Sequence, residues 1–246
     1  MTVGVLVPAY NEEKTIAQVL TKLVGLKYVN EIIVVNDASK DRTLHKIATV
    51  KSRKIVTITQ KYNQGKTAAI KRAVSESKSD IVIIQDADLE YDPIEIALVI
   101  DPILKGQADV VYGSRFMVRK ATRVLYFYHY LANQTLTFFS NLLTNLNMTD
   151  IETCYKAFKR PILAHLPLSS SGYGMEVEIT ALISKLPLRI YEVPISYYGR
   201  TYEEGKKIGL RDGFMALIYV FYFNLIAPFD SKYLKYFMKV RKDLKL

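Results

Sequence analysis

Ile81-Val82-Ile83-Ile84-Gln85-Asp86-Ala87-Asp88 is the stretch that decides the fold of this chain. Its aliphatic residues, 81–84, have the composition of a strand buried on both faces, which is typical of parallel sheets. Such sheets bind ligands outside the carboxyl ends of their strands, and Asp86 and Asp88 follow there directly. Two carboxylates two residues apart can face one cavity and hold Mg²⁺ or Mn²⁺, which usually bridges a diphosphate. The alternative for an isolated Asp-x-Asp is a pair of solvated loop acids.

Short β-rich runs alternate with segments of helical spacing through the first half of the chain. The runs are 3–7, 32–35, 55–59 and 110–112, and the helical segments lie around 16–23, 44–50 and 68–74. This alternation predicts an α/β fold with a mostly parallel sheet and right-handed crossovers. The pattern changes after residue 113. There, residues 190–198 read as a strand interrupted by Pro194, which predicts an edge strand or a bulge.

The composition indicates a protein with a substantial core and anionic partners. The chain has 246 residues, 50% of them hydrophobic, which suffices for one domain with appendages. The single cysteine, Cys154, excludes an internal disulfide and suits a reducing cytosol. The first apolar strand begins at Val3 without a basic leader, so we expect no signal peptide. The net charge of +10 predicts an anionic lipid or a phosphorylated substrate; no nucleic-acid-reading module is recognised, so we expect no nucleic acid.

Three later segments suggest a membrane surface. Residues 125–146 are rich in aromatics and leucine and suit an interfacial helix, with a pair of core helices as the alternative. Residues 213–229 carry no charge but fall short of the about 20 apolar residues of a comfortable span. We expect a helix that is buried against the protein or lies in the membrane interface, with a true span as the alternative. The basic amphipathic tail after Asp230 suits anionic headgroups, or else forms a solvated terminal helix.

Polar motifs also follow the other predicted strands. Asn11 can cap the next helix, with Glu12 and Glu13 in its first turn. Asp37 lies directly after the second strand, where a carboxylate can accept hydrogen bonds from a base or ribose. Lys66, in an Asn-Gln-Gly-Lys turn, can lie near a phosphate at a helix start. Neither the Gly-x-Gly-x-x-Gly motif of dinucleotide folds nor a phosphate-binding loop ending in Lys-Ser/Thr is present after the first strand.

In their order and spacing these motifs resemble the family-2 glycosyltransferases over nearly the whole chain. The resemblance rests on Val7-Pro8-Ala9-Tyr10-Asn11-Glu12, Val35-Asn36-Asp37-Ala38-Ser39, Asn63-Gln64-Gly65-Lys66 and Asp86-Ala87-Asp88. A narrower resemblance to dolichyl- and polyprenyl-phosphate hexose synthases uses Gly113-Ser114-Arg115, Glu152-Thr153-Cys154-Tyr155-Lys156, Gly172-Tyr173-Gly174-Met175-Glu176, Tyr198-Gly199-Arg200 and Glu204-Gly205-Lys206-Lys207. Asn36 departs from the pattern, because many members have aspartate there, and this weakens any charged role for position 36.

The resemblance implies a GT-A type, Rossmann-like, mostly parallel sheet flanked by helices, with C-terminal amphipathic or interfacial helices. Residues 1–113 would form the nucleotide-sugar-binding half, 114–212 the acceptor-binding half and 213–246 a membrane-associating tail. The implied enzyme is an inverting, metal-dependent hexosyltransferase that uses a nucleotide diphosphate sugar, GDP-mannose or UDP-glucose, and a polyprenyl or dolichyl phosphate. It would work at the cytoplasmic face of the membrane, peripheral or interfacially embedded, on an anionic surface. The oligomeric state stays open.

The resemblance also implies site residues. The catalytic residues would be Asp86, Asp88 and Arg200, and the metal ligands Asp86, Asp88 and Glu90. The donor would contact Pro8, Tyr10, Glu12, Asp37, Lys66, Asp86, Ala87, Asp88, Arg200 and Lys206. The acceptor phosphate would meet Arg115, with Arg123 and His129 as further candidates.

Three further expectations concern carboxylates and a loop. Arg200 and Lys206 would reach the diphosphate from a mobile loop flanked by Gly199 and Gly205, with a solvated basic loop as the alternative. Asp92 begins an N-cap, proline and capping-box sequence, Asp92-Pro93-Ile94-Glu95, and is left out of the metal site. Glu176 or Glu178 would be the base if one is needed, or else a glutamate on a helix surface.

The sequence is also compatible with two other classes of function. A transferase of the same family could act on a polysaccharide, a protein or a soluble acceptor. A non-catalytic binder could dock on a membrane surface through the basic tail, although the intact Asp86 and Asp88 pair argues against it.

Overall fold

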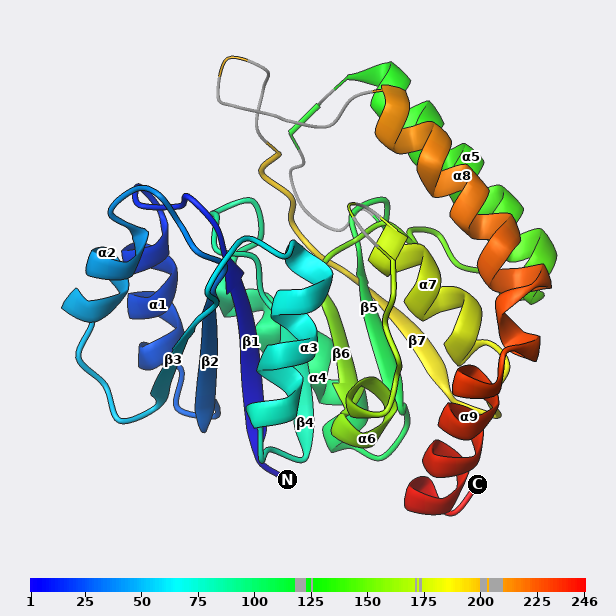
Figure 1. The fold of residues 1–246 in the computed structure, drawn as a ribbon, viewed down its shortest axis with the longest axis horizontal. Coiled ribbons are helices and arrows are strands. Elements are labelled where there is room, and N and C mark those ends of the chain that lie inside the picture. The colour runs from blue at the N-terminus through cyan, green and yellow to red at the C-terminus, as the bar shows by residue number, and fades with distance from the viewer. Residues whose placement is uncertain (118–122, 125, 171, 173, 200–202, 204–209) are drawn as a thin grey trace.

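One mixed sheet organises the chain (Figure 1). The computed structural model describes all residues except 118–122, 125, 171, 173, 200–202 and 204–209. Among the residues so described, the sheet has seven strands in the order β3-β2-β1-β4-β6-β5-β7. The strands are β1 (Val3–Ala9), β2 (Glu31–Asn36), β3 (Ile55–Thr59), β4 (Ile81–Ile84), β5 (Val110–Ser114), β6 (Lys156–Lys159) and β7 (Ile190–Pro194).

The first half of the sheet confirms the predicted parallel α/β pattern. Strand β1 pairs in parallel with β2 on one side and with β4 on the other. All four residues of β4 are buried, as expected for a strand covered on both faces. The chain runs outward from β1 to β3 and then returns to β4 on the other side of β1. This reversal creates a switch point at the carboxyl ends of β1 and β4, where α/β sheets bind ligands.

Strand β6 was missed by the sequence analysis. It lies between β4 and β5 and runs antiparallel to both, so β5 does not pair with β4 as simple alternation suggests. Its four residues, Lys-Ala-Phe-Lys, place a lysine on each side of only two apolar residues, so the local sequence does not predict a strand. The predicted strand after residue 190 is confirmed as β7, which lies at the sheet edge and ends at Pro194.

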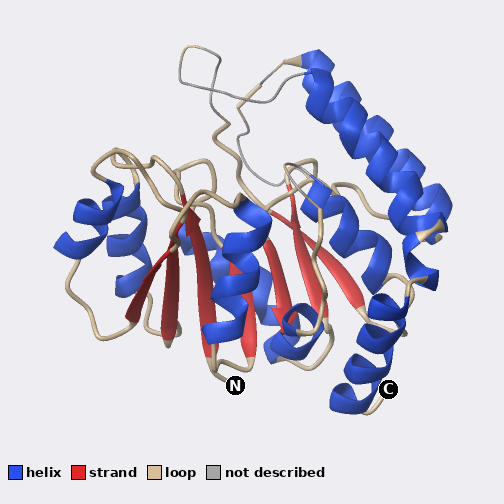
Figure 2. Cartoon of the chain, in the orientation of Figure 1, coloured by secondary structure: helices blue, strands red, loops and turns tan. Residues whose placement is uncertain are grey.

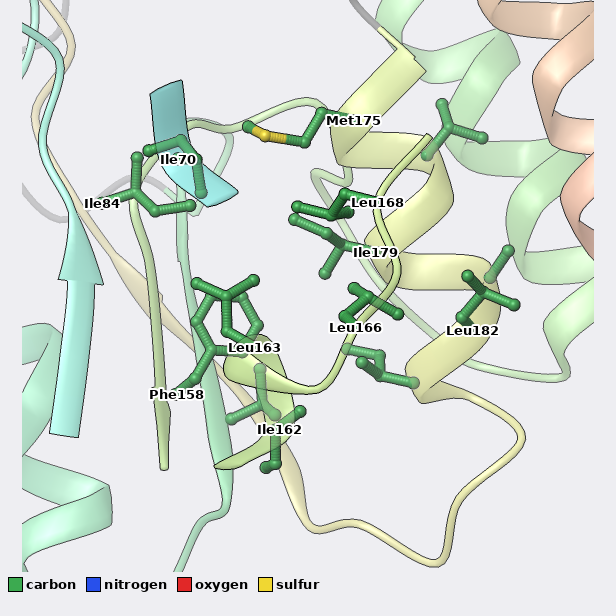
Figure 3. Close-up of a cluster of buried hydrophobic side chains, with 14 of the residues drawn as sticks. Ile70, Ile84, Phe158, Ile162, Leu163, Leu166, Leu168, Met175, Ile179 and Leu182 are labelled. Atoms are coloured by element: carbon green, nitrogen blue, oxygen red, sulfur yellow. The ribbon is translucent and has the colours of Figure 1, made fainter. Parts of the chain in front are cut away.

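Helices cover both faces of the sheet (Figure 2). One face carries α1 (Ile16–Gly25), α2 (Thr43–Thr49), the 3-10 turn η1 (Pro93–Glu95) and α4 (Ile96–Leu104). The other carries α3 (Lys66–Glu76), α6 (Arg160–Ala164), α7 (Gly174–Ile183), α8 (Leu210–Leu225), η2 (Ala227–Phe229) and α9 (Ser231–Leu244), with α5 (Phe127–Thr144) packed on α8. In Figure 3, Met175 and Ile179 of α7 point toward Ile70, Ile84 and Phe158, all of one buried cluster. This packing fixes α7 beside the end of β4.

Two predicted helix starts have opposite outcomes. Asp92 does cap η1, because its side chain accepts a hydrogen bond from Ile94 N at 3.3 Å and Pro93 follows it. Asn11 does not cap α1, whose N-cap is Thr15. Asn11 instead adopts a positive φ of 56°, and its side chain accepts from Lys40 N at 2.8 Å. Asparagine tolerates this left-handed conformation better than most residues, which suits it to a tight turn after a strand.

A buried carboxylate joins the later strands. Asp109, immediately before β5, pairs with Lys159 of β6 at 2.6 Å and with Arg189, which precedes β7, at 3.0 Å. Burial alone would raise the pKa of Asp109, but hydrogen bonds from Arg189 and Lys159 outweigh it and lower the pKa to about 2. Asp109 is therefore ionised at neutral pH and holds three neighbouring strands at one end.

Candidate functional site

The predicted acids lie at the switch point of the sheet. Asp86 and Asp88 follow β4 and are half-buried, while Ala87 between them is buried. Gln85, which the sequence analysis did not single out, fixes this segment. Its buried side chain accepts from Tyr155 OH at 2.8 Å and donates to Asp86 O at 3.2 Å. Both predicted acids therefore lie at the carboxyl edge of the sheet, directly after β4.

Lys66 contacts the first of these acids. Its Nζ lies 2.7 Å from Asp86 Oδ1 and donates to Cys154 Sγ at 2.9 Å. Burial raises the pKa of Asp86, but Lys66 outweighs burial and lowers it. Burial likewise lowers the pKa of Lys66, yet the carboxylate of Asp86 reverses this and raises it well above its usual range. Both groups are therefore charged at neutral pH.

Helix α7 brings a second carboxylate to the same place. Glu176 Oε1 lies 3.6 Å from Lys66 Nζ and accepts from Cys154 Sγ at 3.7 Å. Its other oxygen, Oε2, is buried and has no hydrogen-bond partner within the described part of the chain. Glu176 is only 4% exposed, so its interpretation as a helix-surface residue is wrong. A buried carboxylate with a lone oxygen beside Asp86 belongs to the site.

Glu178 has a structural role that excludes it as the base. It is fully buried, and its carboxylate accepts from Ser169 N at 2.9 Å, Ser170 N at 2.9 Å and Tyr233 OH at 2.7 Å. These bonds hold the segment before α7 against α9. No local pattern in the sequence predicts this role, because Tyr233 lies 55 residues further along the chain than Glu178.

A third glutamate lies next to Glu176. Burial raises the pKa of Glu152, the Glu176 carboxylate raises it further, and the result is about 8. Its Oε1 is buried without a hydrogen-bond partner among the residues described. Below it, Lys156 is fully buried and its Nζ donates to the carbonyls of Ile151, at 3.0 Å, and Thr153. Burial lowers the pKa of Lys156.

Asp37 lies after β2 as predicted and organises the neighbouring loop. It is only 3% exposed, and it accepts from Gln60 Nε2 at 2.9 Å, Gln64 N at 2.8 Å and Gly65 N at 2.7 Å. Gly65 has a φ of 85°, which glycine adopts without strain, and Lys66 follows it as the first residue of α3. Asp37 thereby sets where Lys66 begins its helix. Its contact with a base or ribose stays a prediction.

The turns after β1 and β2 are tied together beside Asp37. Pro8, Tyr10 and Glu12 are partly exposed there, as a nucleoside pocket would require. Glu12 N donates to Thr43 Oγ1 at 2.8 Å, and Asn11 N donates to Ser39 Oγ at 3.0 Å. The three predicted donor residues of β1 and its turn therefore share one edge of the sheet with Asp37 and Asp86.

The predicted acceptor residues lie on the other side of the acids. Arg115 forms a two-pronged ion pair with Asp150, with Nε to Oδ2 at 2.7 Å and Nη2 to Oδ1 at 2.8 Å. Arg123 is exposed and its Nη1 donates to Gly199 O at 2.9 Å. His129 lies in the first turn of α5. Asp150 was missed, because nothing in its local sequence predicts that it faces Arg115.

The third predicted metal ligand is engaged elsewhere. Glu90 Oε2 accepts from Tyr197 OH at 3.0 Å. Over the described ranges, no cluster of three or more histidine, cysteine, aspartate or glutamate side chains is arranged to hold a metal ion. The structure therefore does not gather Asp86, Asp88 and Glu90 into a three-acid cage. Arg200 and Lys206 lie outside the described residues.

An apolar surface lies along α5 and α8, which pack side by side (Figure 1). Phe127, Tyr128 and Phe138 of α5 are 67%, 82% and 62% exposed, so α5 is not a core helix. The other large apolar side chains exposed on these two helices are Tyr130, Leu131, Leu142, Phe214, Met215, Ile218, Phe221, Tyr222 and Leu225. We call this set, with Phe127, Tyr128 and Phe138, the α5–α8 surface.

The apolar segment 213–229 and the basic tail after Asp230 differ in part from the helices that the sequence predicts. Residues 213–229 are divided between α8 and η2. Within the described chain, Arg211–Phe229 is the one stretch with the length and apolar content to cross a membrane, and 28% of it is buried in the protein. The apolar side of α9 is not exposed, because Tyr233, Tyr236 and Val240 are buried in the core. The outward side carries Lys235, Lys239, Arg241 and Lys242, together with the exposed Leu234 and Met238.

Comparisons with known proteins agree on a family. The model of the family described as Glycosyl transferase family 2 matches residues 4–166. UDP-N-acetylglucosamine–dolichyl-phosphate N-acetylglucosaminyltransferase of Methanococcus voltae is 30% identical over 229 residues, covering 85% of this chain and 90% of that protein. Dolichol-phosphate mannosyltransferase of Pyrococcus furiosus is 28% identical over 216 residues, covering 85% of this chain but 60% of that protein's length. Undecaprenyl-phosphate mannosyltransferase of Micrococcus luteus is 28% identical over 222 residues, covering 85% of this chain and 88% of that protein.

A solved structure shares the fold. Glucosyl-3-phosphoglycerate synthase from Mycobacterium tuberculosis, in complex with Mn²⁺, uridine diphosphate and glucosyl-3-phosphoglycerate, aligns with a TM-score of 0.71. The alignment covers 91% of this chain and 80% of that one at 21% identity. The predicted GT-A sheet flanked by helices is thereby confirmed.

Proposed function

Because the chain belongs to glycosyl transferase family 2, we propose that it moves a hexose from a nucleotide diphosphate sugar to a polyprenyl or dolichyl phosphate. The observation that carries this proposal is the half-buried pair Asp86 and Asp88 at the switch point of the sheet, beside the cation of Lys66. The relatives named above for transfer to dolichyl or undecaprenyl phosphate support the acceptor class. The donor would be GDP-mannose or UDP-glucose, and the transfer would invert the anomeric centre.

The carboxylate oxygens of Asp86 and Asp88 suit a hard divalent cation such as Mg²⁺ or Mn²⁺. Mg²⁺ and Mn²⁺ are commonly held by one or two carboxylates and completed by substrate phosphates and waters, so a three-acid cage is not needed. Asp86 and Asp88 would hold the metal, with Glu90 as a further candidate ligand. When bound, the metal would neutralise charge on the departing diphosphate.

The remaining cations would bind the phosphates on either side of the hexose. Lys66, Arg200 and Lys206 would contact the donor diphosphate, where charge builds as the anomeric bond breaks. Arg115, Arg123 and His129 would receive the acceptor phosphate. The attacking atom is a phosphate oxygen that is already largely anionic near neutral pH, because the second pKa of a phosphate monoester is about 6. A strong general base is therefore less necessary than for a sugar hydroxyl.

Membrane docking would bring the lipid acceptor to this site. The α5–α8 surface presents aromatic and aliphatic side chains of the kind that enter a membrane interface. The outward lysines of α9 would add attraction to anionic headgroups, each contributing about 1 kcal/mol near the surface. We place the protein at the cytoplasmic face, with residues 1–113 on the donor, 114–212 on the acceptor and 213–246 on the membrane.

A lipid-extraction assay tests this function. Membranes that contain the protein are incubated with Mn²⁺ and a labelled nucleotide sugar, extracted with chloroform and methanol, and treated with mild acid. We expect acid-labile label in the organic phase and none with Asp88→Ala. Label that stays in the aqueous or protein fraction would indicate a polysaccharide, protein or soluble acceptor instead. Metal-dependent nucleotide binding that survives in Asp88→Ala would favour a non-catalytic binder, and thermal shifts with GDP, UDP and their sugars would identify the donor.

A further inference from the structure

The Lys66 ammonium lies within ion-pair distance of two carboxylates, those of Asp86 and Glu176. It lies 2.7 Å from Asp86 Oδ1 and 3.6 Å from Glu176 Oε1, with Cys154 Sγ at 2.9 Å. Asp86 and Glu176 come from different elements, the end of β4 and the first turn of α7. The side chain of Lys66 is 28% exposed, so it has room to move, whereas that of Glu176 is 5% exposed.

A divalent cation and Lys66 would compete for Asp86. A metal bound to this carboxylate lies about 2 Å from its oxygen, which places it within a few ångströms of the ammonium. Two like charges that close repel each other strongly in a partly buried site. Metal binding at Asp86 therefore favours displacement of the ammonium.

Glu176 offers the displaced ammonium a second partner. Its Oε1 is already within 4 Å of Lys66, and its buried Oε2 has no hydrogen-bond partner among the described residues. A buried carboxylate with an unsatisfied oxygen is costly, and a hydrogen bond from an ammonium would relieve that cost. The short distance means that a change of side-chain rotamer could transfer the contact.

We propose that Lys66 is the resident cation of the metal site, and that it transfers from Asp86 to Glu176 when a divalent metal binds. This inference rests on the proposed function, because it takes the metal site from there. Lys66 then holds the acids together before metal arrives, and Glu176 holds Lys66 afterwards. Both are positioning residues in this step, distinct from the contact of Lys66 with the diphosphate.

Mn²⁺ binding to the enzyme without nucleotide tests the proposal, followed by electron paramagnetic resonance and by thermal shift. The variants are Lys66→Met, Glu176→Gln and the double variant, with Lys61→Met as the matched control, since Lys61 is an exposed lysine of the loop that precedes α3. We expect Lys66→Met to bind Mn²⁺ about tenfold more tightly and Glu176→Gln about tenfold more weakly, the size of change seen for neighbours of metal ligands. In the double variant the effect of Glu176→Gln should vanish.

Other outcomes overturn the proposal. If Glu176→Gln weakens Mn²⁺ binding equally with and without Lys66, Glu176 acts only as a distant negative charge. If Lys66→Met and Lys61→Met bind Mn²⁺ alike, Lys66 does not compete with the metal. If folded wild-type protein binds no Mn²⁺ even with nucleotide present, the proposed metal site fails together with the inference. Circular dichroism of each variant establishes that it is folded.

Discussion

Replacement of Asp37 by asparagine should loosen the loop that positions Lys66. The carboxylate accepts three hydrogen bonds, two at Oδ1 from Gln60 and Gln64 and one at Oδ2 from Gly65. In Asp37→Asn one oxygen becomes an NH₂ group. If the amide oxygen takes the position of Oδ1, the NH₂ faces the Gly65 N–H, donor against donor. The other two bonds persist but lose their charge assistance, which makes them weaker.

The size of the effect follows from these contacts. Loss of one hydrogen bond to a charged group costs about 1.5–3 kcal/mol, and the weakening of two others brings the total to about 3 kcal/mol. For a protein of this size, 1 kcal/mol shifts the melting temperature by about 2–4 °C, so we expect a decrease of about 6–12 °C. The loss should appear in the protein without any ligand.

Thermal unfolding by circular dichroism measures this shift. Asp101→Asn is the matched control, because it makes the same chemical change in an exposed ion pair with Lys105 on α4, a pair that contributes about 0.3–0.5 kcal/mol. A melting temperature for Asp37→Asn close to that of the control, together with lost nucleotide affinity, would refute the reasoning. Asp37 would then act by touching the nucleoside, as the family resemblance suggests, and not by anchoring the loop.

Three further predictions concern buried charges and one tyrosine. Arg115→Met leaves Asp150 buried and unpaired, so we expect a loss of about 3–5 kcal/mol in urea unfolding, partly recovered when Asp150→Asn is added. The pKa of Asp109 is about 2 in the folded protein and near 3.9 in the unfolded chain. Its ionised form therefore stabilises the fold above about pH 3.9, and this stabilisation is lost as the pH falls through about 2. Asp109→Asn should be less stable than wild type at pH 7, and the difference should disappear near pH 2. Tyr233→Phe removes a 2.7 Å hydrogen bond to Glu178, costs about 1–2 kcal/mol, and should speed proteolytic cleavage of α9; unchanged cleavage would contradict this role.

Much of the structure of residues 1–113 could be predicted because its signals are local. A strand buried on both faces needs a continuous apolar run, which 81–84 supplies, and polar residues just after such strands must lie at the carboxyl edge of the sheet. Asp37, Asp86 and Asp88 were located in this way from their own segments. The short antiparallel strand β6 was not, because its lysines are accommodated only by partners far away, as Lys159 is by Asp109.

The features of the site likewise divide into those that local sequence predicts and those that depend on contacts between distant segments. The amino-acid sequence by itself determined the parallel α/β core, the two acids at the end of β4 and the apolar, basic character of the C-terminal third, since each depends on composition and spacing within one segment. Only the tertiary structure decided the pairing of Lys66 with Asp86 and Glu176, of Arg115 with Asp150, and of Glu178 with Tyr233. A charged side chain takes its partner from whatever the fold brings within about 3–4 Å, and those contacts join residues from 20 to 110 positions apart.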